Sequence, residues 1–270
     1  MPMRSLILTR ATDLAHPTER PASGVLAQAQ ASGWALVHWP LIEVVPAADA
    51  PTLAQLHQVW RPDSPWQAVF FVSAGAARHF FAHRPQDAAW PGWSTWCTGP
   101  ATAKVLRELG VPESSLVHPN LADGQWDSET LWPIVATGVQ PGTRVLRVRG
   151  RDAANGPVEG EGRDWLGDQL RARGATVTSV AAYERRVPVW LPAQRAQALT
   201  ALSDGSVWWF SSAQAVRNLH TLLGEADVSQ ALAVATHERI AQVCRRWGWS
   251  EVQVCRPDVD SVMKSIESFQ

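Results

Sequence analysis

Residues 69–78 read VFFVSAGAAR, and residues 208–217 read WWFSSAQAVR. Five of the ten paired positions are identical: Phe71/Phe210, Ser73/Ser212, Ala74/Ala213, Ala76/Ala215 and Arg78/Arg217. Each copy joins an apolar, strand-forming run to a helical pattern that starts at small residues. A duplicated βα unit predicts two similar lobes, and two lobes enclose a cleft of the kind that ligands favour.

The similarity continues on both sides of this stretch at nearly the same offset. Upstream, residues 6–10 (LILTR) pair with 145–149 (VLRVR), and ASGWALV around Gly33 pairs with ARGATVT around Gly174. Downstream, residues 98–110 (TGPATAKVLRELG) pair with 236–248 (THERIAQVCRRWG). A chain of 270 residues is long enough for two domains, which agrees with the repeat.

Short apolar runs alternate with helical patterns along the chain. The predicted strands are residues 6–9, 35–39, 68–72, 96–98, 117–118, 144–148, 177–182, 206–210, 231–235 and 251–255. The predicted helices are residues 21–32, 74–82, 101–109, 127–136, 163–173, 192–202, 213–223, 238–247 and 258–268. Residues 70–72 and 208–210 are continuously apolar, as strands of a parallel sheet are when both of its faces are buried. We therefore expect an α/β protein with two doubly wound parallel-sheet lobes.

Two segments interrupt this alternation at equivalent places in the two repeats. Residues 40–44 follow the first βαβ pattern, and residues 183–187 follow its counterpart. Both are short and β-prone, and a proline follows each of them, at Pro46 and Pro188. We expect these segments to be the crossings between the lobes.

Composition excludes several classes of protein. A net charge of −1 argues against a nucleic-acid-binding surface, which needs a basic excess. The three cysteines, Cys97, Cys244 and Cys255, have no CxxC spacing, so we expect neither a disulfide framework nor a zinc site. The N-terminus lacks the apolar core of a signal peptide, and no apolar run approaches the ~18 residues of a membrane span. We expect a soluble, cytoplasmic protein with no membrane and no nucleic-acid partner.

Polar residues and glycines follow most of the predicted strands. In open α/β sheets ligands bind outside the carboxyl ends of the strands, where helix N-termini attract anions. The predicted ligand-binding residues at these ends are Thr9, Arg10, Ser73, Thr98, Gly99, Arg149, Gly150, Ser211, Ser212 and Thr236. Together they favour a polyanionic ligand. The alternative is that Ser73, Ser212 and Thr236 only cap helices.

Two further features invite a functional interpretation. The glycine- and arginine-rich loop 149–163 is either an anion-binding loop that leads into a helix at Arg163 or a flexible surface loop. Tyr183 is the single tyrosine of the chain and lies in a predicted crossing. A phenol with a pKa of ~10 is neutral at physiological pH and can donate a proton. The alternative is an amphipathic side chain on an exposed ribbon. There is no GxSxG or HExxH motif, and the histidines lack metal-ligand spacing.

These segments, in their order and spacing, resemble the uroporphyrinogen-III synthase family over essentially the whole chain. The resemblance is carried by residues 6–10, 33–41, 71–78, 99–103, 145–150, 162–163, 174–186, 210–219 and 236–241. It implies two doubly wound lobes that are interleaved in sequence and joined by a two-stranded antiparallel ribbon. Residues 1–38 and 188–270 would form one lobe, 44–181 the other, and 39–43 with 182–187 the ribbon.

The resemblance also implies a reaction. The family converts hydroxymethylbilane, a linear tetrapyrrole polycarboxylate, into uroporphyrinogen III with loss of water and inversion of ring D, and it uses no metal or organic cofactor. Tyr183 matches the family's tyrosine that assists loss of the hydroxyl group. Arg163 matches a basic loop residue, and Ser211 or Ser212 matches a second-lobe serine. We expect a monomer, because one chain can form the whole cleft.

The chain departs from the family pattern at two places. Gly75 stands where relatives often carry a polar or basic residue, and residues 237–241 (HERIA) replace a Gly-Pro-x-Thr-Ala motif. Two other classes of function stay open at this point. One is a two-lobed binding protein for an anionic metabolite that performs no chemistry. The other is a methyltransferase or dehydrogenase with a Rossmann lobe, which the absence of a glycine-rich loop after the first strand disfavours.

Overall fold

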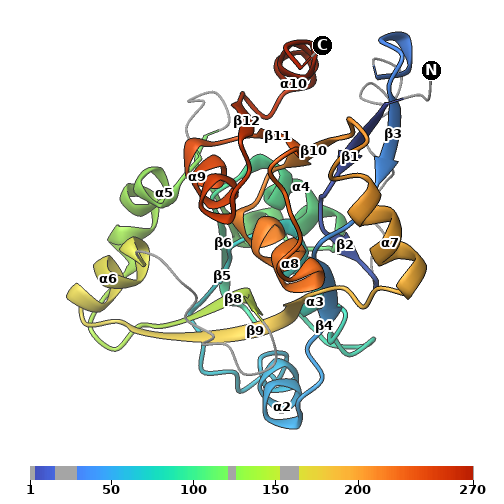
Figure 1. The fold of residues 1–270 in the computed structure, drawn as a ribbon. Coiled ribbons are helices and arrows are strands. Elements are labelled where there is room, and N and C mark those ends of the chain that lie inside the picture. The colour runs from blue at the N-terminus through green and yellow to red at the C-terminus, as the bar shows by residue number, and fades with distance from the viewer. Residues whose placement is uncertain (1–3, 16–28, 121–125, 153–163, 270) are drawn as a thin grey trace. The chain divides into compact units, whose positions relative to one another are not determined.

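The computed structural model describes residues 4–15, 29–120, 126–152 and 164–269 (Figure 1). The chain forms two compact units. The first comprises Met1–Val44 and Arg186–Gln270, and the second comprises Val45–Arg185. The chain therefore passes twice from one unit to the other. The finer division, with 39–43 and 182–187 set apart as an antiparallel ribbon, stays a prediction.

The first unit is built on a five-stranded sheet. Its strands are β1 (Ser5–Leu8), β3 (Ala35–His38), β10 (Val207–Phe210), β11 (Leu232–Ala235) and β12 (Glu251–Val254). They run in the order β12-β11-β10-β1-β3, and each neighbouring pair is parallel. The short strand β2 (Thr12–Asp13) pairs in parallel with the start of β4 (Glu43–Pro46).

Helices cover both faces of this sheet. They are α7 (Pro192–Thr200), α8 (Ala213–Leu223), α9 (Glu238–Trp247) and α10 (Val259–Glu267). Ile7, Trp208 and Phe210 pack in one core with residues of α7, α8 and α9. Because successive strand residues point to opposite faces, Leu8 and Trp209 pack in a second core with residues of α10.

The second unit contains the other sheet. Five strands of that seven-stranded sheet lie in this unit: β5 (Ala68–Phe71), β6 (Ser94–Cys97), β7 (Leu116–Val117), β8 (Arg144–Asp152) and β9 (Thr176–Arg186). They run in the order β9-β8-β5-β6-β7 with parallel neighbours. Its helices are α2 (Ala50–Gln58), α3 (Ala74–Phe81), α4 (Pro100–Glu108), α5 (Ser128–Val135) and α6 (Trp165–Ala172), with 3₁₀ turns at Glu113–Ser115 and Ala136–Gly138.

Burial on both faces explains why the strands of this sheet are so apolar. All four residues of β5 are buried. Val69 and Phe71 share a core with residues of α2, α3 and α4. Ala68 and Phe70 face the other way, into a core with residues of α5 and α6. The second unit is therefore also doubly wound.

Three elements differ from the sequence-based expectation. The helix α2 was not predicted, although Asp49 caps it with a 3.0 Å hydrogen bond from Thr52 N–H and a proline occupies its first turn. The strand β8 runs on to Asp152, and β9 runs without a break from Thr176 to Arg186, so that the predicted strand 177–182 and the crossing 183–187 are one strand. Each strand gains hydrogen bonds from the other by extending, which sequence patterns do not reveal.

The predicted helix 21–32 lies largely outside the described residues. In the part of the chain that the structure describes, no helix has the length and apolar character needed to cross a membrane.

Candidate functional site

Three of the predicted site residues lie close together near the strand ends of the second unit: Ser73, Gly150 and Tyr183. Ser73 follows β5 and caps α3, because its hydroxyl accepts a 3.1 Å hydrogen bond from Ala76 N–H. Tyr183 lies beside it: a Cβ atom built on Gly75, in the first turn of α3, would be 3.9 Å from Ser73 Oγ and 4.0 Å from Tyr183 Cε1. The Tyr183 ring also covers Gly150, whose hypothetical Cβ would be 2.8 Å from Cδ2 and closer still to Cε2 and Cζ.

Tyr183 is half-buried at the edge of the core that covers the α3 face of the sheet. Its ring centroid lies 5.2 Å from that of the buried His79, with 35° between the ring planes. The phenol is therefore backed by packed side chains while part of it stays accessible. This combination suits a proton donor that must hold one orientation.

Thr98 and Gly99 follow β6 at the same edge of the sheet. Gly99 is the N-cap of α4, and a glycine has no side chain to accept from the first N–H groups of the helix. These donors, together with the helix dipole, can receive an anion.

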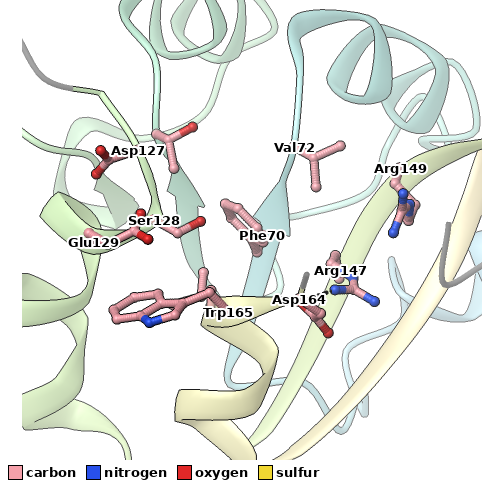
Figure 2. Close-up of a pocket in the computed structure, with 11 residues that line it drawn as sticks. Phe70, Val72, Asp127, Ser128, Glu129, Arg147, Arg149, Asp164 and Trp165 are labelled. Atoms are coloured by element: carbon pink, nitrogen blue, oxygen red, sulfur yellow. Dashed lines mark ion pairs between the residues drawn. The ribbon is translucent and has the colours of Figure 1, made fainter. Parts of the chain in front are cut away.

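A hollow of about 420 Å³ opens on the face of the sheet that α5 and α6 cover (Figure 2). It is lined by Phe70, Val72, Thr98, Asp127, Ser128, Glu129, Arg147, Arg149, Asp164, Trp165 and Leu166. Two predicted site residues, Thr98 and Arg149, therefore share this hollow. Tyr183 packs on the opposite face of the same sheet, with the α3 core.

Arg147 is the most tightly held cation of the hollow. It is 5% exposed, it forms an ion pair with Asp164, and its Nε and Nη2 donate to Ser179 Oγ at 3.0 and 2.8 Å. Asp164 is also the N-cap of α6 and accepts from Gly167 N–H at 3.1 Å. The pair thus fastens the start of α6 to the middle of β8 (Figure 2).

Sequence analysis missed Arg147 and Asp164 as site residues. A signal for Arg147 was present, because Arg147 and Arg149 alternate in the run RVLRVR and so share one face of the strand. No comparable signal pointed to Asp164, whose partner lies on the preceding strand, beyond the reach of a local pattern. Arg163, the predicted basic residue of this loop, lies outside the described residues.

The acidic side chains of the hollow serve partly as helix caps. Asp127 accepts from Thr130 N–H at 2.8 Å, and the Thr130 hydroxyl accepts from Asp127 N–H, which completes a capping box at the start of α5. Asp164 has the same role at α6. The hollow therefore combines two capped helix N-termini with two arginines, rather than presenting uniform positive charge.

The strand ends of the first unit are largely occupied by structural hydrogen bonds. The buried Thr9 hydroxyl donates to the Trp209 carbonyl at 2.7 Å, and the exposed Arg10 places its guanidinium 5.7 Å from the centre of the Trp209 ring. Ser212 caps α8 by accepting from Gln214 N–H at 3.2 Å, while Ser211 is exposed. The capping alternative is thus realised for Ser73 and Ser212, although a cap can also contact a ligand.

Thr236 does not cap a helix. Its N–H donates to the Phe210 carbonyl at 3.1 Å, and the cap of α9 is the next residue, His237, whose Nδ1 accepts from Arg239 N–H at 3.0 Å. The ring nitrogen replaces the usual hydroxyl or carboxylate acceptor. The capping alternative is therefore wrong for Thr236, and its predicted role in ligand binding stays a prediction.

Cys97 ends β6, directly before Thr98, and has no features of a nucleophile. It is buried, and burial raises the pKa of its thiol to about 12. A thiol must ionise to react, so this residue is held in its unreactive form. Among the described residues, no three His, Cys, Asp or Glu side chains are grouped so as to hold a metal ion.

The family assignment comes from comparison with known proteins. The family model described as uroporphyrinogen-III synthase HemD matches residues 24–264, most of the chain. The chain belongs to the uroporphyrinogen-III synthase family. A relative in this family, the uroporphyrinogen-III synthase of Escherichia coli K12, is 27% identical over 238 residues, which cover 85% of this chain and 89% of that protein.

Solved structures of the uroporphyrinogen-III synthase family share the fold. The uroporphyrinogen-III synthetase of Helicobacter pylori 26695 has a TM-score of 0.61 at 13% identity, covering 99% of this chain and 100% of its own. A mutant uroporphyrinogen III synthase from Thermus thermophilus has a TM-score of 0.51 at 15% identity, covering 97% of this chain and 98% of its own. The predicted α/β fold of two doubly wound lobes is confirmed.

Proposed function

We propose that this chain converts hydroxymethylbilane into uroporphyrinogen III, with loss of water and inversion of ring D. The observation that carries the proposal is the family match over residues 24–264. The position of Tyr183 supports it, because the phenol lies at the carboxyl ends of the strands, beside Ser73 and the start of α3. The roles of individual residues belong to the same proposal.

Tyr183 is the proton donor for loss of the terminal hydroxyl group. The phenol protonates that oxygen as its bond to carbon breaks, and water, a phenolate and the protonated azafulvene result. The substituted α-carbon of ring D then attacks the electrophilic methylene carbon of the azafulvene to give a spiro intermediate. Fragmentation and reclosure of the intermediate invert ring D. The proton lost from the ring α-carbon restores the phenol, so the steps balance without a metal or organic cofactor.

The substrate carboxylates meet the donors at the strand ends. The first N–H groups of α4, which follow Gly99, and the Arg149 guanidinium are suited to carboxylate oxygens. Thr9, Arg10, Gly150, Arg163, Ser211, Ser212 and Thr236 complete the proposed set of binding residues. Holding a flexible chain with its two ends adjacent supplies much of the catalysis, because it removes the entropy of bringing them together.

We place this reaction in a cytoplasmic monomer. The test is a product assay: the purified chain receives hydroxymethylbilane, and the products are oxidised and separated by isomer. We expect isomer III, whereas a sample without protein gives isomer I by closure without inversion. Isomer I alone, together with tight binding of the bilane, would instead support the binding-protein alternative.

A further inference from the structure

We propose that Gly150 is a positioning residue for Tyr183, because the missing side chain leaves the space that the phenol ring occupies. The inference deepens the proposed function, since it concerns the orientation of the proposed proton donor. Gly150 is buried in β8, and a Cβ atom there would lie 2.8 Å from Tyr183 Cδ2 and closer to Cε2 and Cζ. Real Cβ atoms essentially never approach side-chain atoms within 3.0 Å.

The requirement for glycine concerns space rather than backbone conformation. Eight glycines in the described part of the chain have a positive φ, for example Gly174 and Gly248, and Gly150 is not among them. An alanine could therefore adopt the backbone angles of Gly150 without strain. What it could not do is coexist with the Tyr183 ring in its present place.

An irregularity in the pairing of β8 with β9 places the Tyr183 ring over Gly150. Arg149 pairs with Ala181, but the next residue, Gly150, pairs with Tyr183, so that Ala182 is an extra residue on β9. Neighbours in a regular strand point to opposite faces. Here Ala182 and Tyr183 both pack with the α3 core, as expected when a bulge redirects a side chain.

A buried ion pair holds the two strands in this shifted register. Arg151 and Glu184 are the next paired residues, and they are 9% and 2% exposed. The Arg151 Nε donates to Glu184 Oε1 at 3.0 Å, and its Nη2 donates both to Glu184 and, at 2.7 Å, to Asp49 Oδ2. Because a slip by one residue would separate these buried charges, the pair fixes Tyr183 opposite Gly150.

The experiment compares Gly150→Ala with Gly75→Ala. Both glycines face the Tyr183 ring, but a Cβ on Gly75 would be in ordinary van der Waals contact, 4.0 Å from Cε1. Tyr183 is the only tyrosine, so ¹³C-labelled tyrosine gives an NMR spectrum of this one ring. We expect Gly150→Ala to shift the ring signals and Gly75→Ala to leave them nearly in place. Unchanged signals in folded Gly150→Ala would overturn the inference.

Activity provides a second readout. A displaced proton donor should lower kcat by about 100-fold, whereas Gly75→Ala should keep kcat within about twofold of the wild type. In a Tyr183→Phe background, Gly150→Ala should cause no comparable further loss of kcat. Additive losses in the double variant would contradict a role that acts through Tyr183.

A third variant covers the case in which Gly150→Ala folds poorly. Removing the ring in Gly150→Ala/Tyr183→Ala frees the contested space, so the thermal unfolding midpoint should return to that of Tyr183→Ala. Failure of this rescue would refute the steric relationship. These spectroscopic and stability outcomes do not depend on which reaction the protein catalyses, so failure of the positioning role and failure of the proposed function are separable.

Discussion

The carboxylate of Asp164, which caps α6, forms an ion pair with the buried guanidinium of Arg147 in the middle of β8. Figure 2 shows Arg147 and Asp164 side by side, below Arg149 in this view. The pair joins the start of α6 to the middle of the strand that precedes it along the chain. One carboxylate therefore serves two purposes, as a helix cap and as the partner of a buried cation.

The substitution Asp164→Asn separates these two roles. Asparagine caps helices as well as aspartate does, but it cannot neutralise Arg147. We expect the free energy of unfolding to fall by about 2 kcal/mol, because a buried charge loses its charged partner. Equilibrium unfolding in urea measures this free energy for the variant and for the wild type. The control is Asp168→Asn, whose exposed carboxylate contacts Arg171 at 3.3 Å and should matter by no more than about 0.5 kcal/mol. Equal effects of the two variants would contradict this interpretation.

Tyr183→Phe tests the proton donor. The ring, its contact with His79 and its place over Gly150 are all retained, so the free energy of unfolding should change by less than about 1 kcal/mol. Formation of isomer III should slow by about 100-fold, the usual effect of losing a general acid. Assays that are quenched at successive times and analysed for product isomer measure this rate. Turnover close to that of the wild type would remove Tyr183 from the proton-transfer step.

Arg149→Gln tests the carboxylate contact in the hollow. The glutamine keeps hydrogen-bond donors but loses the charge, so we expect KM for hydroxymethylbilane to rise about tenfold with little effect on kcat. The control is Arg144→Gln, an exposed arginine at the other end of β8, which should leave KM unchanged. If the two variants behave alike, the hollow does not bind the substrate.

The cysteines should resist modification in the folded protein. Burial raises the pKa of Cys97 and that of Cys244 to about 12. At pH 8 the reactive thiolate is then only about 10⁻⁴ of each thiol, and it increases about tenfold per pH unit. Mass spectrometry after iodoacetamide treatment should find both residues unlabelled at pH 8 in the folded protein but labelled in urea. Rapid labelling of folded Cys97, next to the strand end at Thr98, would contradict its assignment as an inert core residue.

Much of the fold could be predicted because local patterns and packing agree. The helices α8 and α9 occur at the predicted bounds, since each has an apolar face and a polar N-cap residue. The strands β5 and β10 are continuously apolar because both of their faces are buried. The helix α2 escaped prediction although its signals, Asp49 and a first-turn proline, were local. Its short apolar pattern, with Leu56 as its buried residue, was too weak to stand out.

The sequence alone determined the duplicated α/β architecture, the family and the strand ends at which polar residues gather, because these depend on period, order and spacing along the chain. Only the tertiary structure decided that Tyr183 covers Gly150, that Arg147 pairs with Asp164 and that His237 rather than Thr236 caps α9. Gly150 and Tyr183 are far apart in sequence, and their contact depends on one extra residue in β9. Such a shift in register is decided by cross-strand packing and buried charge, which no local pattern encodes.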